Sequence, residues 1–166
     1  MANYYAGIGS RETPADVLRT MKICASKLEK GIIIPSTTSK RRYILRSGGA
    51  KGADSAFEAG VIVRQKKEIF LAKHCTPEAE ALSAEFHPYW NNLNQWVRYL
   101  MGRNVMILLG RDLKTPVDFV LCWTPGARVT GGTGHGLRVA KHFGIQVFNM
   151  ANPHWKDQVK EWKAQQ

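Results

Sequence analysis

The chain has 166 residues, 44% of them hydrophobic, and this fits a single globular domain spanning residues 1–166. Its 24 lysines and arginines outnumber its 13 acidic residues, and the net charge of +11 attracts anions such as nucleotides or nucleic acid. No apolar segment approaches the roughly 18 residues of a membrane span, and the three cysteines form no Cys-x-x-Cys pair. We therefore expect a cytoplasmic protein without a metal, a cofactor or a membrane partner.

The first third of the chain predicts strand and helix segments in alternation. An apolar run over residues 4–8 predicts a buried strand, and Thr13 with Pro14 predicts the N-cap and first residue of a helix. The apolar runs 32–34 and 43–45 are interpreted as one strand that a polar, basic loop interrupts.

The alternation continues to the end of the chain. Helices are predicted over 53–61, from 76–78 onward, as one or two segments within 86–109, over 137–143 and from 152. Strands are predicted over 68–71, 117–123 and 145–148. This order predicts an α/β fold, a Rossmann-like, doubly wound and mainly parallel sheet of about five or more strands flanked by helices.

Three glycine-rich segments follow predicted strands, at 9–11, 47–54 and 131–136. Ligands bind such sheets at the carboxyl ends of the strands, so these segments are expected to gather along one rim. Glycine lets the main chain approach a phosphate, and the start of a helix adds unpaired N–H groups and a positive dipole end. The candidate ligand-binding residues here are Gly9, Ser10, Arg11, Ser47, Gly48, Gly49, Ala50, Lys51, Gly52, Asp54, Gly131, Gly132, Thr133, Gly134 and His135.

Individual side chains suggest roles within these segments. Arg11 is expected to grip phosphate through a bidentate fork, with a surface carboxylate as its alternative partner, and Lys51 adds a second cation. Asp54 either accepts from a ribose hydroxyl or caps a helix. Thr133 donates to an anion in a backbone nest, with a plain surface turn as the alternative, and His135 alone is weak support for catalysis.

The segment after the fourth predicted strand adds Trp123 and Thr124 to the candidate site. Trp123 either stacks on a base or belongs to the core. Basic and aromatic groups also occur together at 40–43 and around Arg98, where they are suited to bind phosphates and stack bases. For Trp96 and Tyr99 the helical spacing favours the core instead.

The order of motifs resembles a superfamily of Rossmann-like proteins. Gly9-Ser10-Arg11 is similar to its Gly-Ser-Arg signature after the first strand, and the segment 47–54 to its Ser-Gly-x-Ala-x-Gly-x-Asp loop. Arg103-Asn104 resembles an Arg-Asn pair that opens a helix before the fourth strand. The superfamily contains DNA-processing protein A (DprA, or Smf), the LOG proteins and the SLOG nucleotide-sensing domains, and the chain resembles its short, phage-encoded members.

The resemblance implies a nucleotide site that includes Arg103 and Asn104, a homo-oligomer, and the host cytoplasm as location. LOG proteins cleave nucleoside monophosphates with a glutamate just after the third glycine loop, where this chain has Gly134–Arg138. We therefore expect no catalytic residue and favour a protein that binds a nucleotide or nucleotide-derived signal, of the cyclic ADP-ribose or cyclic oligonucleotide type, and sequesters it against host defence. A single-stranded DNA-binding recombination accessory is the alternative, and a LOG-like phosphoribohydrolase is the third hypothesis.

Overall fold

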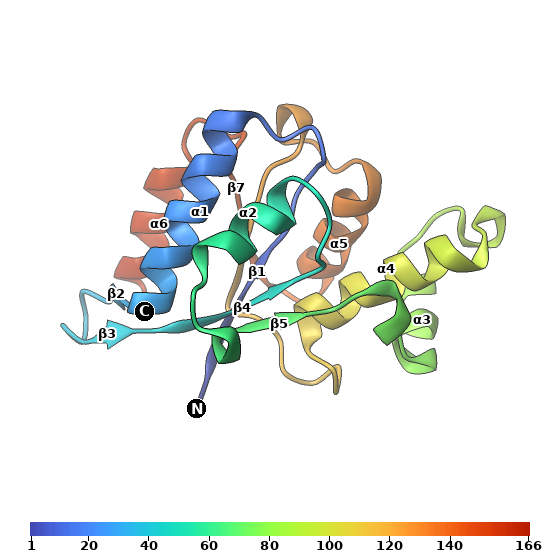
Figure 1. Ribbon diagram of the computed structural model, residues 1–166, viewed down its shortest axis with the longest axis horizontal. Helices are drawn as coiled ribbons and strands as arrows, with labels where there is room; N and C mark the ends of the chain where they lie inside the picture. Colours follow the sequence, from blue (N-terminus) through green and yellow to red (C-terminus); the bar gives the residue numbers. More distant parts are fainter.

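Five parallel strands form the central sheet of the computed structural model, which describes residues 1–166 (Figure 1). The strands are β1 (Asn3–Gly7), β4 (Tyr43–Ser47), β5 (Lys67–Ile69), β6 (Phe119–Cys122) and β7 (Gln146–Asn149). They lie in the order β5-β4-β1-β6-β7, and every neighbouring pair is parallel. The predicted α/β fold is therefore confirmed, and the direction of the strand order reverses between β1 and β6.

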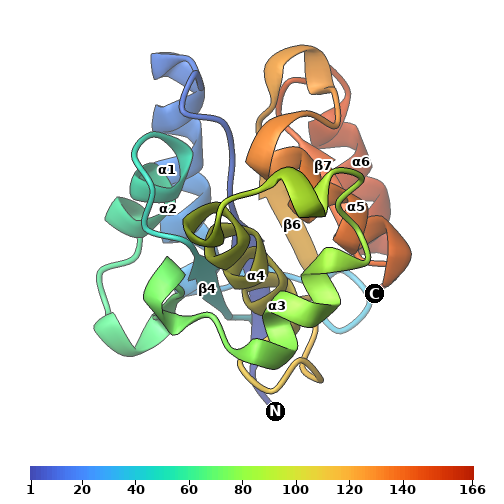
Figure 2. The same cartoon turned by 90° about the vertical axis from the view of Figure 1, so that its right-hand side faces the viewer.

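Helices cover both faces of this sheet (Figures 1 and 2). They are α1 (Ala15–Lys30), α2 (Ala53–Gly60), α3 (Pro77–Ala84), α4 (Gln95–Leu109), α5 (Gly131–His142) and α6 (Trp155–Ala164). Tyr5 of β1 packs in the core cluster under α1, α2 and α6, whereas Ala6 packs in the cluster under α4 and α5. Successive residues of a strand point to opposite faces, so each buried strand must be apolar on both.

The segment 32–45 differs from the prediction. Residues Ile32–Ile33 (β2) and Lys40–Arg41 (β3) pair antiparallel as a separate two-stranded hairpin, and only residues 43–47 join the central sheet. The chain turns back because the carbonyl oxygen of Ile34 accepts a hydrogen bond of 3.1 Å from the N–H of Thr37. The prediction of one interrupted strand is therefore wrong, and Lys40 and Arg41 of the basic loop form a strand of the hairpin.

The start of α1 also differs from the prediction. Pro14 is the N-cap and makes no side-chain cap bond, so the helix begins at Ala15. Thr13 is buried, and its hydroxyl donates to the carbonyl oxygen of Ser10 at 2.6 Å. Thr13 therefore closes the loop after β1 instead of capping the helix.

The start of α3 follows the sequence pattern. Thr76 is its N-cap and accepts a hydrogen bond from the N–H of Ala79 at 3.2 Å, and Pro77 is the first helical residue. Within 86–109, a short 3₁₀ turn at Trp90–Asn92 precedes the single helix α4. None of the helices combines the length and the apolar character needed to cross a membrane.

Thr76→Ala is expected to lower the free energy of unfolding by about 1 kcal/mol, because it leaves the N–H of Ala79 without its cap acceptor. Urea denaturation followed by circular dichroism measures the effect. Thr20→Ala, inside α1, removes a hydroxyl that donates to the carbonyl oxygen of Asp16 and is expected to change stability by only a few tenths of a kcal/mol. Equal losses in the two variants would contradict the assigned cap.

Candidate functional site

A cavity of about 530 Å³, here called the first cavity, opens where the chain leaves the carboxyl ends of β1 and β6. This is the point where the strand order reverses, and doubly wound sheets bind their ligands there. Its lining residues are Ile8, Gly9, Ser10, Arg11, Glu12, Ala50, Asp54, Leu100, Met101, Arg103, Asn104, Pro125, Thr130, Gly131, Gly132 and Thr133. Its volume lies in the range of small-molecule sites.

The first cavity gathers about half of the predicted site residues. Those that line it are Gly9, Ser10, Arg11, Ala50, Asp54, Arg103, Asn104, Gly131, Gly132 and Thr133. Those that do not are Ser47, Gly48, Gly49, Lys51, Gly52, Trp123, Thr124, Gly134 and His135. The expectation that the three glycine-rich segments meet at one rim therefore holds at the level of segments but not of every residue.

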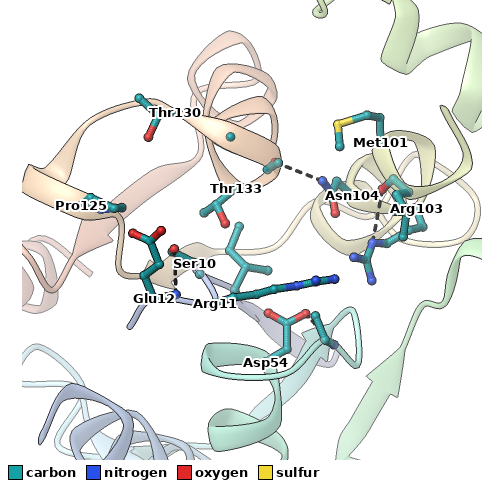
Figure 3. Close-up of a pocket in the computed structure, with 16 residues that line it drawn as sticks. Ser10, Arg11, Glu12, Asp54, Met101, Arg103, Asn104, Pro125, Thr130 and Thr133 are labelled. Atoms are coloured by element: carbon teal, nitrogen blue, oxygen red, sulfur yellow. Dashed lines mark hydrogen bonds between the residues drawn. The ribbon is translucent and has the colours of Figure 1, made fainter. Parts of the chain in front are cut away.

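Arg11 is the cation that projects most freely into the first cavity. Its side chain is exposed and extends above the Asp54 carboxylate toward the guanidinium of Arg103 (Figure 3). The two ion pairs of the structure join other residues, and the side chain of Arg11 makes no hydrogen bond. Beside it, the hydroxyl of Ser10 accepts from the N–H of Glu12 at 3.1 Å and keeps its own proton to donate. Arg11 is thus not paired with the surface carboxylate that was considered as its alternative partner.

Asp54 organises the second glycine-rich segment. One oxygen of this carboxylate, which is 5% exposed, accepts hydrogen bonds from the N–H groups of Gly48 and Ala50, both at 3.2 Å. Burial raises the pKa of Asp54 to about 6, although the nearby Arg103 and the two N–H groups oppose the rise. Two of the amides expected to cradle a phosphate are therefore already used within the protein.

Arg103 ties α4 to this same segment. It lies in the middle of α4, not at a helix start as the resemblance implied. Its guanidinium donates to the carbonyl oxygens of Gly48 and Phe70, the latter at 3.2 Å. A Cβ at Gly48 would overlap that guanidinium, so the glycine here admits a side chain of the protein itself and not a ligand. Burial and the neighbouring Arg11 lower the pKa of Arg103, whereas Asp54 raises it.

The third glycine-rich segment is helical and not a loop, because α5 begins at Gly131. The first hydrogen bond of this turn runs from the N–H of Gly134 to the carbonyl oxygen of Thr130, at 2.9 Å. The N–H groups of residues 131–133 therefore have no partner within the helix, and these residues line the first cavity. Asn104 holds the turn in place by donating to the carbonyl oxygen of Gly132 at 3.2 Å (Figure 3).

His135 lies in the core and not in the cavity. It is fully buried, and its Nε2 lies 2.7 Å from the hydroxyl of Ser83 in α3. Burial, together with Arg138 and His87, lowers the pKa of His135 to about 4. The imidazole is therefore neutral near pH 7, and its predicted place in an anion nest is wrong.

Three further predicted residues hold the rim together instead of lining it. The hydroxyl of Ser47 donates to the carbonyl oxygen of Gly7 at 2.6 Å, and that of Thr124 accepts from Asn149 at 2.7 Å. Trp123 is half-buried and packs against the core cluster under α1 and α6, as the core alternative for this residue predicts. All three are positioned by the sheet, at the ends of β4 and β6.

Glu12 is a lining residue that was not predicted. Its exposed carboxylate lies on the opposite side of Arg11 from Asp54 and points toward Pro125 (Figure 3). The signal was present, because Glu12 directly follows Gly9-Ser10-Arg11 at the end of the first strand. The first cavity is thus lined by two carboxylates, those of Glu12 and Asp54.

A separate opening around Arg46, of about 590 Å³, is less suited to a charged ligand. Arg46 there is paired with Glu68 at 2.7 Å, stacks on the ring of Tyr4 and donates to the carbonyl oxygen of Thr115. The buried cation of this opening is therefore satisfied within the protein, in contrast to Arg11.

Comparison of the chain with family models, with curated proteins and with solved structures found no match. What the first cavity does is therefore argued from its own geometry. It presents two guanidinium groups, a free hydroxyl and an unpaired helix N-terminus to one space, and this arrangement suits an anion with several oxygens.

Proposed function

We propose that the chain binds a nucleotide or nucleotide-derived signal in the first cavity. One observation carries the proposal: the unpaired Arg11 and the N-terminus of α5 face the same cavity, at the point where the strand order reverses. A phosphate there accepts from the guanidinium of Arg11 and from the N–H groups of residues 131–133. Its charge also relieves the repulsion between Arg11 and Arg103.

Sequestration is the role that we propose for this binding. The ligand is a signal of the cyclic ADP-ribose or cyclic oligonucleotide type, and its removal from solution silences a host defence, as in a phage anti-defence protein. The resemblance to DprA, LOG and SLOG proteins supports this proposal only through the segments at 9–11 and 47–54.

Single-stranded DNA binding is the second candidate, and one observation favours it. Trp96 and Tyr99, which the helical spacing assigned to the core, are 61% and 37% exposed on α4. Exposed aromatic rings beside a cationic cavity are suited to stack on bases. DNA binding through several phosphates weakens steeply as salt rises, whereas binding of a small nucleotide depends on salt much less. A salt titration of the affinity therefore separates these candidates.

Hydrolysis of the nucleotide is the third candidate, because Glu12 and Asp54 both line the first cavity. The raised pKa of Asp54 is typical of a general acid, but its carboxylate already binds two backbone N–H groups. We rank binding above hydrolysis for this reason.

An uptake experiment tests the proposal. The purified protein is mixed with cyclic ADP-ribose isomers and cyclic dinucleotides, separated from free ligand, and heated to release what it holds. We expect mass spectrometry to recover the ligand intact. An altered ligand would establish an enzyme instead, and no uptake of any of these ligands would overturn the proposal.

Arg11→Gln is expected to lower the affinity for a mononucleotide about 10- to 30-fold, because it removes charge-assisted hydrogen bonds to the phosphate. Isothermal titration calorimetry measures the change. The melting temperature is expected to stay constant, since Arg11 makes no ion pair or side-chain hydrogen bond with the rest of the chain.

The matched control is Arg64→Gln, which makes the same change of charge in the 3₁₀ turn Arg64–Lys66, outside the first cavity. It is expected to leave the affinity within a factor of two. Equal losses in both variants would reduce the role of Arg11 to net charge, and no loss in Arg11→Gln would place the site elsewhere.

A further inference from the structure

A second cavity, of about 380 Å³, adjoins the first. The two share four lining residues, Arg11, Ala50, Leu100 and Arg103, so they form two compartments on either side of the two arginines. Gly48 and Gly49 line the second cavity and not the first. The segment 47–54 therefore lines both cavities, and the second cavity is large enough for a small organic group.

Trp96 gives the second cavity its distinctive surface. It is the second residue of α4 and lines this cavity with 61% of its surface still exposed. The neighbouring Leu71 in the wall of the cavity is also exposed. An exposed indole at the wall of a cavity offers a flat apolar face, and nucleic-acid bases stack on such faces with little regard to their identity.

The positive groups are arranged as a phosphate linkage between two nucleosides requires, with arginines at the boundary of the two cavities and a further positive group in each. Arg11 and Arg103 both lie at the boundary that the two cavities share. Lys73 lines the second cavity, and the N-terminus of α5 lines the first. A phosphate at the boundary thus contacts Arg11, while the groups attached to it extend into a compartment on each side.

We infer that the ligand carries two bases joined through phosphate, with one base in the first cavity and the other stacked on Trp96 in the second. This inference rests on the proposed function and selects between its ligand classes: it favours a dinucleotide over a one-base ligand such as ADP-ribose. A one-base ligand leaves Trp96 uncovered. A long single strand, in contrast, continues beyond both cavities.

The test compares ligands of one, two and six nucleotides that share the same base. Calorimetry measures the affinity of the protein for AMP, GMP, CMP and UMP, for the corresponding 5′-phosphorylated dinucleotides, and for the hexanucleotides. For at least one base, we expect the dinucleotide to bind at least tenfold tighter than the mononucleotide. The hexanucleotide is expected to bind no more than about threefold tighter than the dinucleotide.

Trp96→Ala is expected to remove the dinucleotide gain, lowering that affinity about tenfold while changing the mononucleotide affinity less than twofold. Trp96→Phe retains an aromatic face and is expected to restore most of the gain. The control is Tyr89→Ala, because Tyr89 is a more exposed aromatic residue that lines neither cavity.

Each outcome decides a separate point. If mononucleotides bind through Arg11 but the second nucleotide adds nothing, the two-base ligand is refuted and the proposed function stands. If no mononucleotide or dinucleotide binds, both fail. A hexanucleotide that binds far tighter than the dinucleotide refutes the two-base ligand in favour of a strand. If Trp96→Ala changes the sedimentation of the protein and not its dinucleotide affinity, the residue belongs to a protein interface.

Discussion

Arg103→Met is expected to lower the free energy of unfolding by about 3–4 kcal/mol, because two tertiary hydrogen bonds from a charged donor are lost. The carbonyl oxygens of Gly48 and Phe70 lose their guanidinium partner, and α4 loses its tie to the chain beside β4 and β5. Urea denaturation at pH 7 measures the loss. Nucleotide affinity is expected to fall as well, since Arg103 lines both cavities.

Arg98→Met is the control, because Arg98 belongs to the same helix and donates to one carbonyl oxygen, that of Trp90 at 3.2 Å. We expect a loss of about 1 kcal/mol there. Arg103→Lys restores the positive charge but not the planar fork, so it is expected to fall between Arg103→Met and the unchanged protein. A loss for Arg103→Met no larger than that for Arg98→Met would contradict the role given to Arg103.

The sheet was predictable from sequence because its strands are buried on both faces. All four residues of β6 are buried, and this requires the near-continuous apolar character seen at 117–123, which only Asp118 interrupts. The hairpin was not predictable in the same way. Two short apolar runs at 32–34 and 43–45 do not show whether the chain continues or reverses between them, and the turn at Ile34 decides it.

The gathering of glycine-rich segments was predictable because topology alone places them at one rim. Their individual roles were not. A glycine that makes room for a phosphate cannot be distinguished in the sequence from a glycine that makes room for a side chain. At Gly48 the neighbouring group is the guanidinium of Arg103, 55 positions away in the chain. The role of His135 was equally hidden in the sequence. Because α5 begins at Gly131, position 135 falls on the helix face that is turned toward Ser83.

The burial of Asp54 connects the stability of the fold to the chemistry of the site. The pKa of Asp54 is about 6 in the folded chain and 3.8 as its ordinary value. Between these two pH values the unfolded chain releases the proton that the folded chain keeps. The contribution of Asp54 to the free energy of unfolding is therefore fully present below about pH 4 and is lost as the pH rises through about 6. By pH 7 the loss amounts to about 2–3 kcal/mol.

Asp54→Asn is accordingly expected to raise the free energy of unfolding at pH 7 by about 2–3 kcal/mol, and to leave it nearly unchanged at pH 4. The asparagine carbonyl still accepts from the N–H groups of Gly48 and Ala50, so the segment keeps its shape. Urea denaturation of both proteins from pH 4 to 7.5 gives the difference between them.

That difference is the informative quantity, because His135, with a pKa lowered to about 4, makes both proteins less stable as the pH falls from 6.5. Its contribution cancels between the two. If the difference does not change with pH, the pKa of Asp54 is the same in the folded and the unfolded chain, and its environment is not the one described. A neutral residue at position 54 also repels phosphate less, so the variant is expected to bind a nucleotide at pH 7 more tightly than the unchanged protein does.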